Sequence, residues 1–183
     1  LEHSDTLANP FPQHYECYVL IQYQGADNSH MSEMFESMLS GALENGLLMD
    51  VLVAQSSREA DTFWQIRDGI GEVLGQLSPA LGFDVSIPIR DIAAFVNEVE
   101  QQLNEQFSGV RLLLFGHIGD SNLHLAVGLK AAHDKAAIAD LVYQKVSQFH
   151  GSISAEHGIG KLKKKYLACS RSEEERALMK QLK

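Results

Sequence analysis

Residues 110–127 read VRLLLFGHIGDSNLHLAV, and this stretch decides the predicted fold. Its two apolar runs, 110–115 and 123–127, have the length and the flanking residues of β-strands. Residues 119–122 (GDSN), which lie between them, are of the kinds that favour tight turns. The stretch therefore predicts an antiparallel hairpin.

The segments on either side of the hairpin alternate between strand and helix patterns. Aromatic and β-branched runs predict strands, with Pro88 at an edge or at the end of its strand. Apolar residues at helical spacing predict the helices. The expected strands are 15–24, 47–54, 83–89 and 152–155, and the expected helices are 29–45, 57–77, 91–107, 131–150, 161–167 and 172–183. We expect an α+β fold with a ferredoxin-like antiparallel sheet and helices packed on one face.

Composition limits the classes of function. The 183 residues, 45% of them hydrophobic, fit one domain or a pair of subdomains. A formal charge of -9 disfavours binding to nucleic acid. The sequence has no apolar run near the roughly 20 residues of a membrane span, and no signal peptide pattern. Its two cysteines, Cys17 and Cys169, form no disulfide framework. We therefore expect a cytoplasmic protein without a membrane span.

Two histidines lie on opposite sides of the predicted turn. In a hairpin, His117 and His124 can face each other as half of a metal site, which a carboxylate from elsewhere would complete. A structural hydrogen-bonding pair is the alternative that these two residues leave open. Asp120 and Asn122 are turn formers, and Asn122 could also orient a ligand histidine.

The stretch 154–160 (SAEHGIG) supplies a carboxylate and a third imidazole. Adjacent residues of a regular strand point to opposite faces, so Glu156 and His157 can serve one site only if the chain turns there. Gly158 and Gly160 predict such a turn. We expect Glu156 to be a ligand and His157 to remain free as a general base for a hydroxyl that the metal acidifies.

The oxidation of an alcohol also requires a hydride acceptor. The sequence has no GxGxxG after a strand, no Walker loop and no haem motif, so we expect the acceptor on another domain. The chain begins at Leu1 and ends within a helical pattern, which favours a piece of a longer protein.

Four ordered motifs resemble one known family. They are residues 63–70 (FWQIRDGI), 83–88 (FDVSIP), 116–124 (GHIGDSNLH) and 154–161 (SAEHGIGK). Together they closely resemble the C-terminal domain of FAD-linked oxidases of the vanillyl-alcohol-oxidase type, the group that includes 2-hydroxyacid dehydrogenases. The resemblance implies that residues 1–183 are the substrate-binding cap domain, separated here from an N-terminal domain that binds FAD.

The resemblance also implies roles for single residues. His117, His124 and Glu156 would bind a divalent metal, usually zinc, and His157 would accept the substrate hydroxyl proton. Arg67 would bind the substrate carboxylate. The implied reaction oxidises a small D-2-hydroxy acid to a 2-oxo acid with hydride transfer to FAD, and this chain alone would be inactive.

Four positions depart from the family pattern. The 2-hydroxyglutarate branch has a lysine at the position of Gly82, a hydroxylated residue at Gly71 and an asparagine at Ala126. These departures favour a substrate without a second carboxylate. Ser121 replaces a glycine of the turn, which we expect to be a mild change.

Two functions from other classes stay open at this point. One is a metal-binding regulatory or interaction module without redox activity, and the other is a hydrolytic metalloenzyme. The sequence also leaves open the electron acceptor and whether the protein forms a homodimer.

Overall fold

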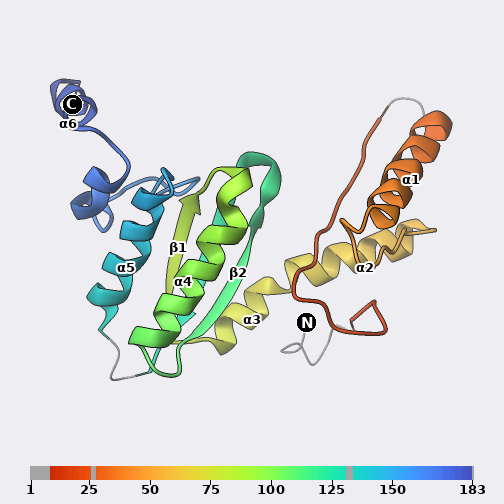
Figure 1. Cartoon of the computed structure of the whole chain (residues 1–183), viewed down its shortest axis with the longest axis horizontal. Helices are drawn as coiled ribbons and strands as arrows, with labels where there is room; N and C mark the ends of the chain where they lie inside the picture. Colours follow the sequence, from red (N-terminus) through yellow and green to blue (C-terminus); the bar gives the residue numbers. More distant parts are fainter. Residues whose placement is uncertain (1–8, 26–27, 131–133, 183) are drawn as a thin grey trace. The chain divides into compact units, whose positions relative to one another are not determined.

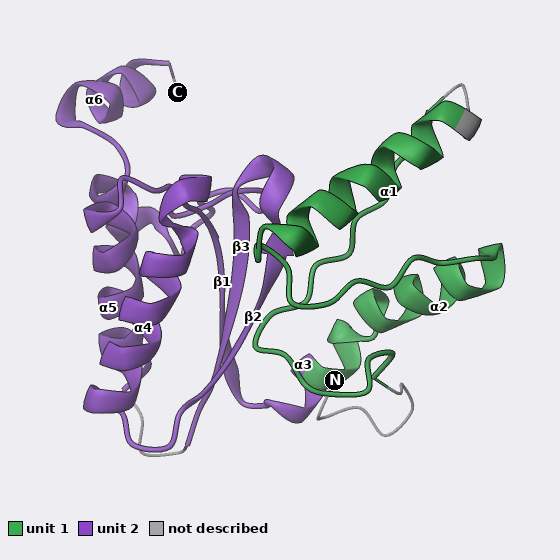
Figure 2. Ribbon diagram, turned by 45° about the vertical axis from the view of Figure 1, so that its right-hand side comes forward, with its two compact units in different colours: residues 1–73 green, residues 74–183 purple. Residues whose placement is uncertain are grey.

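The structure of the chain, a computed structural model, describes residues 9–25, 28–130 and 134–182 (Figure 1). The chain divides into two compact units, residues 1–73 (unit 1) and residues 74–183 (unit 2) (Figure 2). The sequence allowed one domain or a pair of subdomains, and the structure has two units. The fold is of the mixed α+β class that the sequence predicts.

Unit 2 is built on a three-stranded antiparallel sheet. Its strands are β1 (Ala80–Ser86), β2 (Arg111–His117) and β3 (Asn122–Gly128), in the spatial order β1-β3-β2. The helices α4 (Ile92–Gln106) and α5 (Lys135–Gln148) lie side by side on one face of this sheet (Figure 2). The predicted hairpin and the helix expected at 91–107 are therefore confirmed. Part of the helix expected at 131–150 lies outside the described residues.

The hairpin turn is a short 3-10 helix, η2 (Ile118–Asp120), followed by Ser121. Ser121 has φ 62°, in the left-handed region that favours glycine. Serine at this position therefore carries some backbone strain, and the expectation that the change from glycine is mild stays a prediction.

Next to β1, the chain forms a single β-bridge in place of the strand predicted at 152–155. Ser86 and Ser152 exchange backbone hydrogen bonds of 2.9 and 2.8 Å. A Cβ at Gly151 would lie 2.4 Å from the Ser86 carbonyl oxygen, so glycine permits this close approach. The Ser152 hydroxyl then donates to the Ser154 carbonyl, and the chain turns after one bridge. The prediction of a strand here is wrong.

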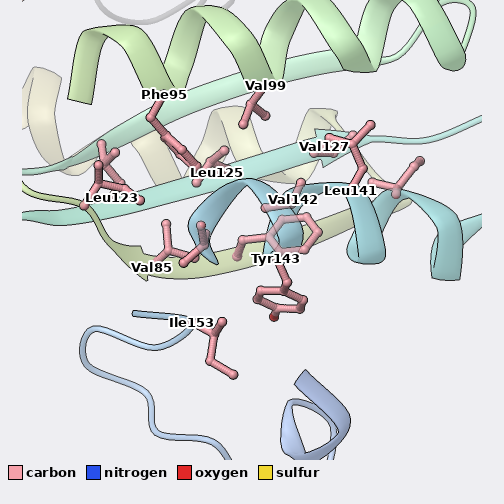
Figure 3. Close-up of a cluster of buried hydrophobic side chains, with 14 of the residues drawn as sticks. Val85, Phe95, Val99, Leu123, Leu125, Val127, Leu141, Val142, Tyr143 and Ile153 are labelled. Carbon is pink, nitrogen blue, oxygen red and sulfur yellow. The ribbon is translucent and has the colours of Figure 1, made fainter. Parts of the chain in front are cut away.

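The core of unit 2 lies between the sheet and the two helices (Figure 3). Side chains alternate along each strand, so every second residue points to the helices. This cluster is fully or nearly fully buried and includes Phe83, Val85, Phe95, Val99, Leu103, Leu123, Leu125, Val127, Ile138, Val142 and Val146. At about 25 cal/mol per Å² of buried apolar area, this face supplies most of the stability of the unit.

Unit 1 contains α1 (Asn28–Glu44) and α2 (Ser57–Asp68), and α3 (Ile70–Gln76) crosses the boundary between the units. The Ser56 hydroxyl accepts from the Glu59 N–H and caps α2. The single helix expected at 57–77 is interrupted at Gly69.

Both strands predicted in unit 1 are wrong, because the described parts of residues 15–24 and 47–54 form no β-ladder. A strand exists only where a neighbouring strand satisfies its backbone groups, whatever the propensity of its side chains. Here the aromatic residues pack locally instead. The rings of Tyr15 and Tyr18 both lie against Phe11, and the Tyr15 hydroxyl donates to Asp50.

The remaining elements are short. After β1, Pro88 precedes η1 (Ile89–Asp91), and β1 is an edge strand of the three-stranded sheet, as the proline predicts. The segment expected to be helical at 161–167 is η3 (Lys164–Cys169), and α6 (Glu173–Gln181) confirms the C-terminal helix. Within the described ranges, no helix has the length and apolar character needed to cross a membrane.

Candidate metal centre

Three potential metal ligands converge on the face of the sheet that α4 and α5 do not cover. His117 ends β2, His124 lies two residues into β3, and Glu156 comes from the loop after the Ser86–Ser152 bridge. Their ligand atoms all lie within 4.8 Å of one another. The histidines are diagonal rather than directly opposite, because His117 pairs with Asn122 in the hairpin register. Their ring centroids are 5.9 Å apart.

This donor set suits a divalent metal. Two imidazoles and one carboxylate are the ligands of many sites that keep an open position for water or substrate. Ligands about 2.1 Å from a tetrahedral zinc ion lie about 3.4 Å apart. The donors must therefore move together by up to about 1.4 Å, a distance that side-chain rotation can supply.

His157 lies beside this cluster. Its ring stacks on His124 with centroids 5.8 Å apart, and its Nε2 lies 4.0 Å from a Glu156 carboxylate oxygen. The side chain is 67% exposed. The turn expected at 156–158 is present, since Gly158 and Gly160 have φ 73° and 52°, so adjacent residues can both reach one site.

Asp84 anchors the turn at Glu156 and His157 through hydrogen bonds, and its side chain is only 3% exposed. Asp84 accepts the backbone N–H groups of Glu156 (3.2 Å) and His157 (2.9 Å) and lies 2.9 Å from the Ser154 hydroxyl. The Lys163 ammonium lies 3.4 Å from the same carboxylate. Burial raises the pKa of Asp84. The two N–H groups, Ser154 and the charge of Lys163 lower the pKa by more than burial raises it, so that its net value is about 2.

Asn122 contacts the proposed carboxylate ligand directly. It is 1% exposed, and its Nδ2 donates to Glu156 Oε1 at 2.6 Å. Its Oδ1 is buried and has no hydrogen-bond partner among the described residues. The Asp120 carboxylate accepts the Asn122 backbone N–H at 3.2 Å, as a turn former does. The sequence interpretation had Asn122 orienting a histidine, whereas in the structure it bonds to Glu156.

The environment of His124 favours its neutral form. Burial lowers the pKa of His124, the nearby carboxylates of Asp84 and Glu156 raise it, and His117 and His157 lower it, with a net decrease. A neutral imidazole is the form that binds a metal.

Arg67, the residue expected to bind the substrate carboxylate, lies in unit 1. It is in the last turn of α2, and its guanidinium lies 3.1 Å from Asp68 Oδ1 with the side chain 46% exposed.

The sequence did not predict the contacts that Asp84 and Lys163 make at this site. Lys163 belongs to a basic run, 161–165, that suggests a solvated face or an anion site, yet its side chain is only 14% exposed and contacts Asp84. One signal was available: Asp84 interrupts an apolar strand between Phe83 and Val85, and buried carboxylates are usually paired.

The fold and the donor cluster define an α+β domain with a candidate metal site. Comparison with known proteins identifies the family of this domain: the family "FAD linked oxidases, C-terminal domain" matches residues 1–183. The chain belongs to this family.

Curated relatives agree with this assignment. The chain is 36% identical over its whole length to a mitochondrial D-2-hydroxyglutarate dehydrogenase of Arabidopsis thaliana, and covers 33% of that protein. It is 35% identical to a D-2-hydroxyglutarate dehydrogenase of Xanthomonas citri pv. viticola, with 95% of this chain and 38% of that protein covered. A Schizosaccharomyces pombe protein provisionally named a mitochondrial D-lactate dehydrogenase is 32% identical, with coverages of 95% and 35%. The chain spans about a third of the length of these relatives.

Proposed function

We propose that this chain is the substrate-side cap domain of an FAD-dependent dehydrogenase that oxidises a D-2-hydroxy acid to a 2-oxo acid. The observation that carries the proposal is the convergence of His117, His124 and Glu156, with the ring of His157 beside them. Family membership supports the requirement for FAD. When bound, FAD supplies the hydride acceptor, and an N-terminal domain is the proposed place of its binding.

His117, His124 and Glu156 are the proposed holders of a divalent metal, and zinc suits their donor atoms. A metal bound there would lower the pKa of a coordinated hydroxyl. Asn122 holds the Glu156 carboxylate through its 2.6 Å hydrogen bond. Asp120 supports the position of Asn122 through the turn.

His157 is the proposed base. Its Nδ1 lies 3.8 Å from the Asp84 carboxylate, which leaves Nε2 as the nitrogen to accept the substrate hydroxyl proton. Its exposure allows a substrate to reach it. Because its Nε2 lies 4.0 Å from the Glu156 carboxylate, a small substrate bound at the proposed metal would also lie next to His157.

The substrate proposal rests on charges around the cluster. Arg67 is the proposed partner of the substrate carboxylate, as the family motif implies. On the sheet face that carries His124, the neighbouring row consists of Gly82, Ala126 and Leu113, none of which is charged. This row favours a small 2-hydroxy acid without a second carboxylate.

The wider architecture is also a proposal. The order of elements in unit 2, with the Ser86–Ser152 bridge beside β1, supports a ferredoxin-like fold whose fourth strand is reduced to one residue pair. A cytoplasmic location and a homodimer are further proposals, although several of the relatives are named as mitochondrial proteins.

The test is a screen of 2-hydroxy acids with the full-length protein and an artificial electron acceptor. We expect turnover of D-2-hydroxy acids with small uncharged side chains, and a loss of at least about 100-fold in kcat for His157→Ala. His150→Ala, on an exposed histidine at the end of α5, is the matched control. Metal binding without any turnover would favour a regulatory module, and hydrolysis without oxidation would favour a metallohydrolase.

A further inference from the structure

Asp84 and Lys163 form a buried ion pair that contacts the turn carrying Glu156 and His157. Asp84 and Lys163 are 3% and 14% exposed, and the Lys163 ammonium also donates to the Asp84 carbonyl oxygen and to the Ser154 hydroxyl, both at 3.2 Å. A buried charge pair contributes little net stability compared with apolar residues of similar volume, so its presence here calls for another explanation.

The contacts of Asp84 give that explanation. Its two oxygens accept consecutive backbone N–H groups, those of Glu156 and His157. These are the residues whose side chains must leave the chain on the same side of the turn. Consecutive N–H groups point to one acceptor only when the backbone is curved, so this carboxylate and the turn fix each other. The register places Asp84 directly opposite His124, on the face that carries the cluster.

We propose that Asp84 is a positioning residue for the metal centre: it holds the backbone of Glu156 and His157 so that the Glu156 carboxylate reaches the two histidines. Lys163 holds this carboxylate in place from its remaining side, with its ammonium 3.4 Å from the carboxylate oxygen. Asp84 is on β1, which carries none of the three ligands, so the edge strand becomes part of the site. The inference rests on the proposed metal site.

The test separates this role from a structural one. Asp84→Asn alone leaves the Lys163 ammonium buried without its counter-charge, and the variant can fail to fold for that reason. The double variant Asp84→Asn/Lys163→Met removes both charges. Its control is Glu98→Gln/Lys145→Met, which neutralises another ion pair of unit 2, in which the buried Lys145 ammonium lies 2.7 Å from the half-exposed Glu98 carboxylate. All variants are made in the full-length protein, and thermal melting checks that each is folded.

The readouts are Zn²⁺ affinity and the visible absorption spectrum of the Co²⁺-loaded protein, which reports coordination geometry. We expect the Asp84/Lys163 double variant to bind Zn²⁺ about 10- to 100-fold more weakly and to change the Co²⁺ spectrum, while the control double variant matches the wild type.

The other outcomes would overturn either the positioning role alone or the proposed metal site together with it. Wild-type affinity and an unchanged Co²⁺ spectrum in the Asp84/Lys163 double variant would overturn the positioning role while leaving the metal site intact. A wild-type protein that binds neither Zn²⁺ nor Co²⁺ overturns the proposed site and the inference together. If the double variant does not fold, Ser154→Ala, which removes a neutral contact of Asp84, is expected to show the same changes in smaller degree, and its wild-type behaviour would overturn the inference.

Discussion

The two faces of the sheet in unit 2 are built from the same strands but differ in almost every physical property. On β3, Leu123, Leu125 and Val127 point to the helices and are at most 5% exposed, while Asn122 and His124 point to the other face. The first face is apolar and packed against α4 and α5. The second holds imidazoles, carboxylates and a buried lysine around one small region.

This difference teaches how a small domain can combine stability with a reactive site. The alternation of side chains along a strand lets one face supply the hydrophobic stabilisation and leaves the other free to hold polar groups near one another. The polar face is ordered by hydrogen bonds and charges instead of packing. Substitutions on the two faces should therefore change different measurements.

The largest effects are expected from neighbouring residues of β3. Leu125→Ala should lower the free energy of unfolding by about 3 kcal/mol, because it opens a cavity in the core, with metal affinity unchanged in the folded fraction. His124→Ala should change stability by less than about 1 kcal/mol and abolish metal binding. Urea denaturation and metal titration measure the two quantities. A similar loss of unfolding free energy in both variants would show that the two faces of the sheet do not differ in their contribution to stability.

The next effect depends on pH. The pKa of Asp84 is about 2 in the folded chain and 3.8 when unperturbed, so its ionised form stabilises the fold fully above pH 4 to 5. This contribution, about 2 kcal/mol, is lost as the pH falls from there through 2. The double variant Asp84→Asn/Lys163→Met, which leaves no buried charge unpaired at this site, should flatten the dependence of unfolding free energy on pH between 5 and 2. An unchanged slope would show that the carboxylate is not stabilised as described.

A smaller effect is expected at Asn122. Asn122→Ala removes the donor to Glu156 and should weaken Zn²⁺ binding by about 10-fold, at the lower end of the range for residues that support a ligand. Asn122→Asp should be worse, since it places a second carboxylate against Glu156. Isothermal titration would measure both. Equal Zn²⁺ affinity in the wild type and both variants would show that Asn122 does not support metal binding.

The smallest effect concerns the turn that joins the two strands. Ser121→Gly should stabilise the chain by about 0.5 to 1 kcal/mol, because glycine adopts φ 62° without strain. Ser108→Gly, at an exposed position with no left-handed backbone, serves as a comparison that should not stabilise. Thermal melting measures the difference, and a lower melting temperature for Ser121→Gly would contradict the account of the turn.

The helix-covered face was largely predictable from sequence, and the polar face only in part. Apolar periodicity predicts α4, β2 and β3 because burial of a repeating pattern depends on local spacing. The same periodicity fails for residues 15–24 and 47–54, where a strand depends on a partner that sequence does not reveal.

The proposed ligands were found because histidines and a glutamate in short glycine-containing motifs are uncommon and chemically specific. Asp84 and Lys163 were not found, since they are 79 positions apart and each belongs to a segment with an ordinary interpretation. Only the tertiary fold brings β1 beneath the turn at 154–158. Contacts of this range are set by the packing of the whole unit and leave no local pattern.

We propose that the polar face binds one metal ion through His117, His124 and Glu156. The most direct test is the zinc content of the purified full-length protein and of its alanine variants at these three positions and at His157. We predict one zinc per chain in the wild type and in His157→Ala, and a loss of zinc in each of the other three variants with their folds retained. Stoichiometric zinc in all four variants would contradict the claim.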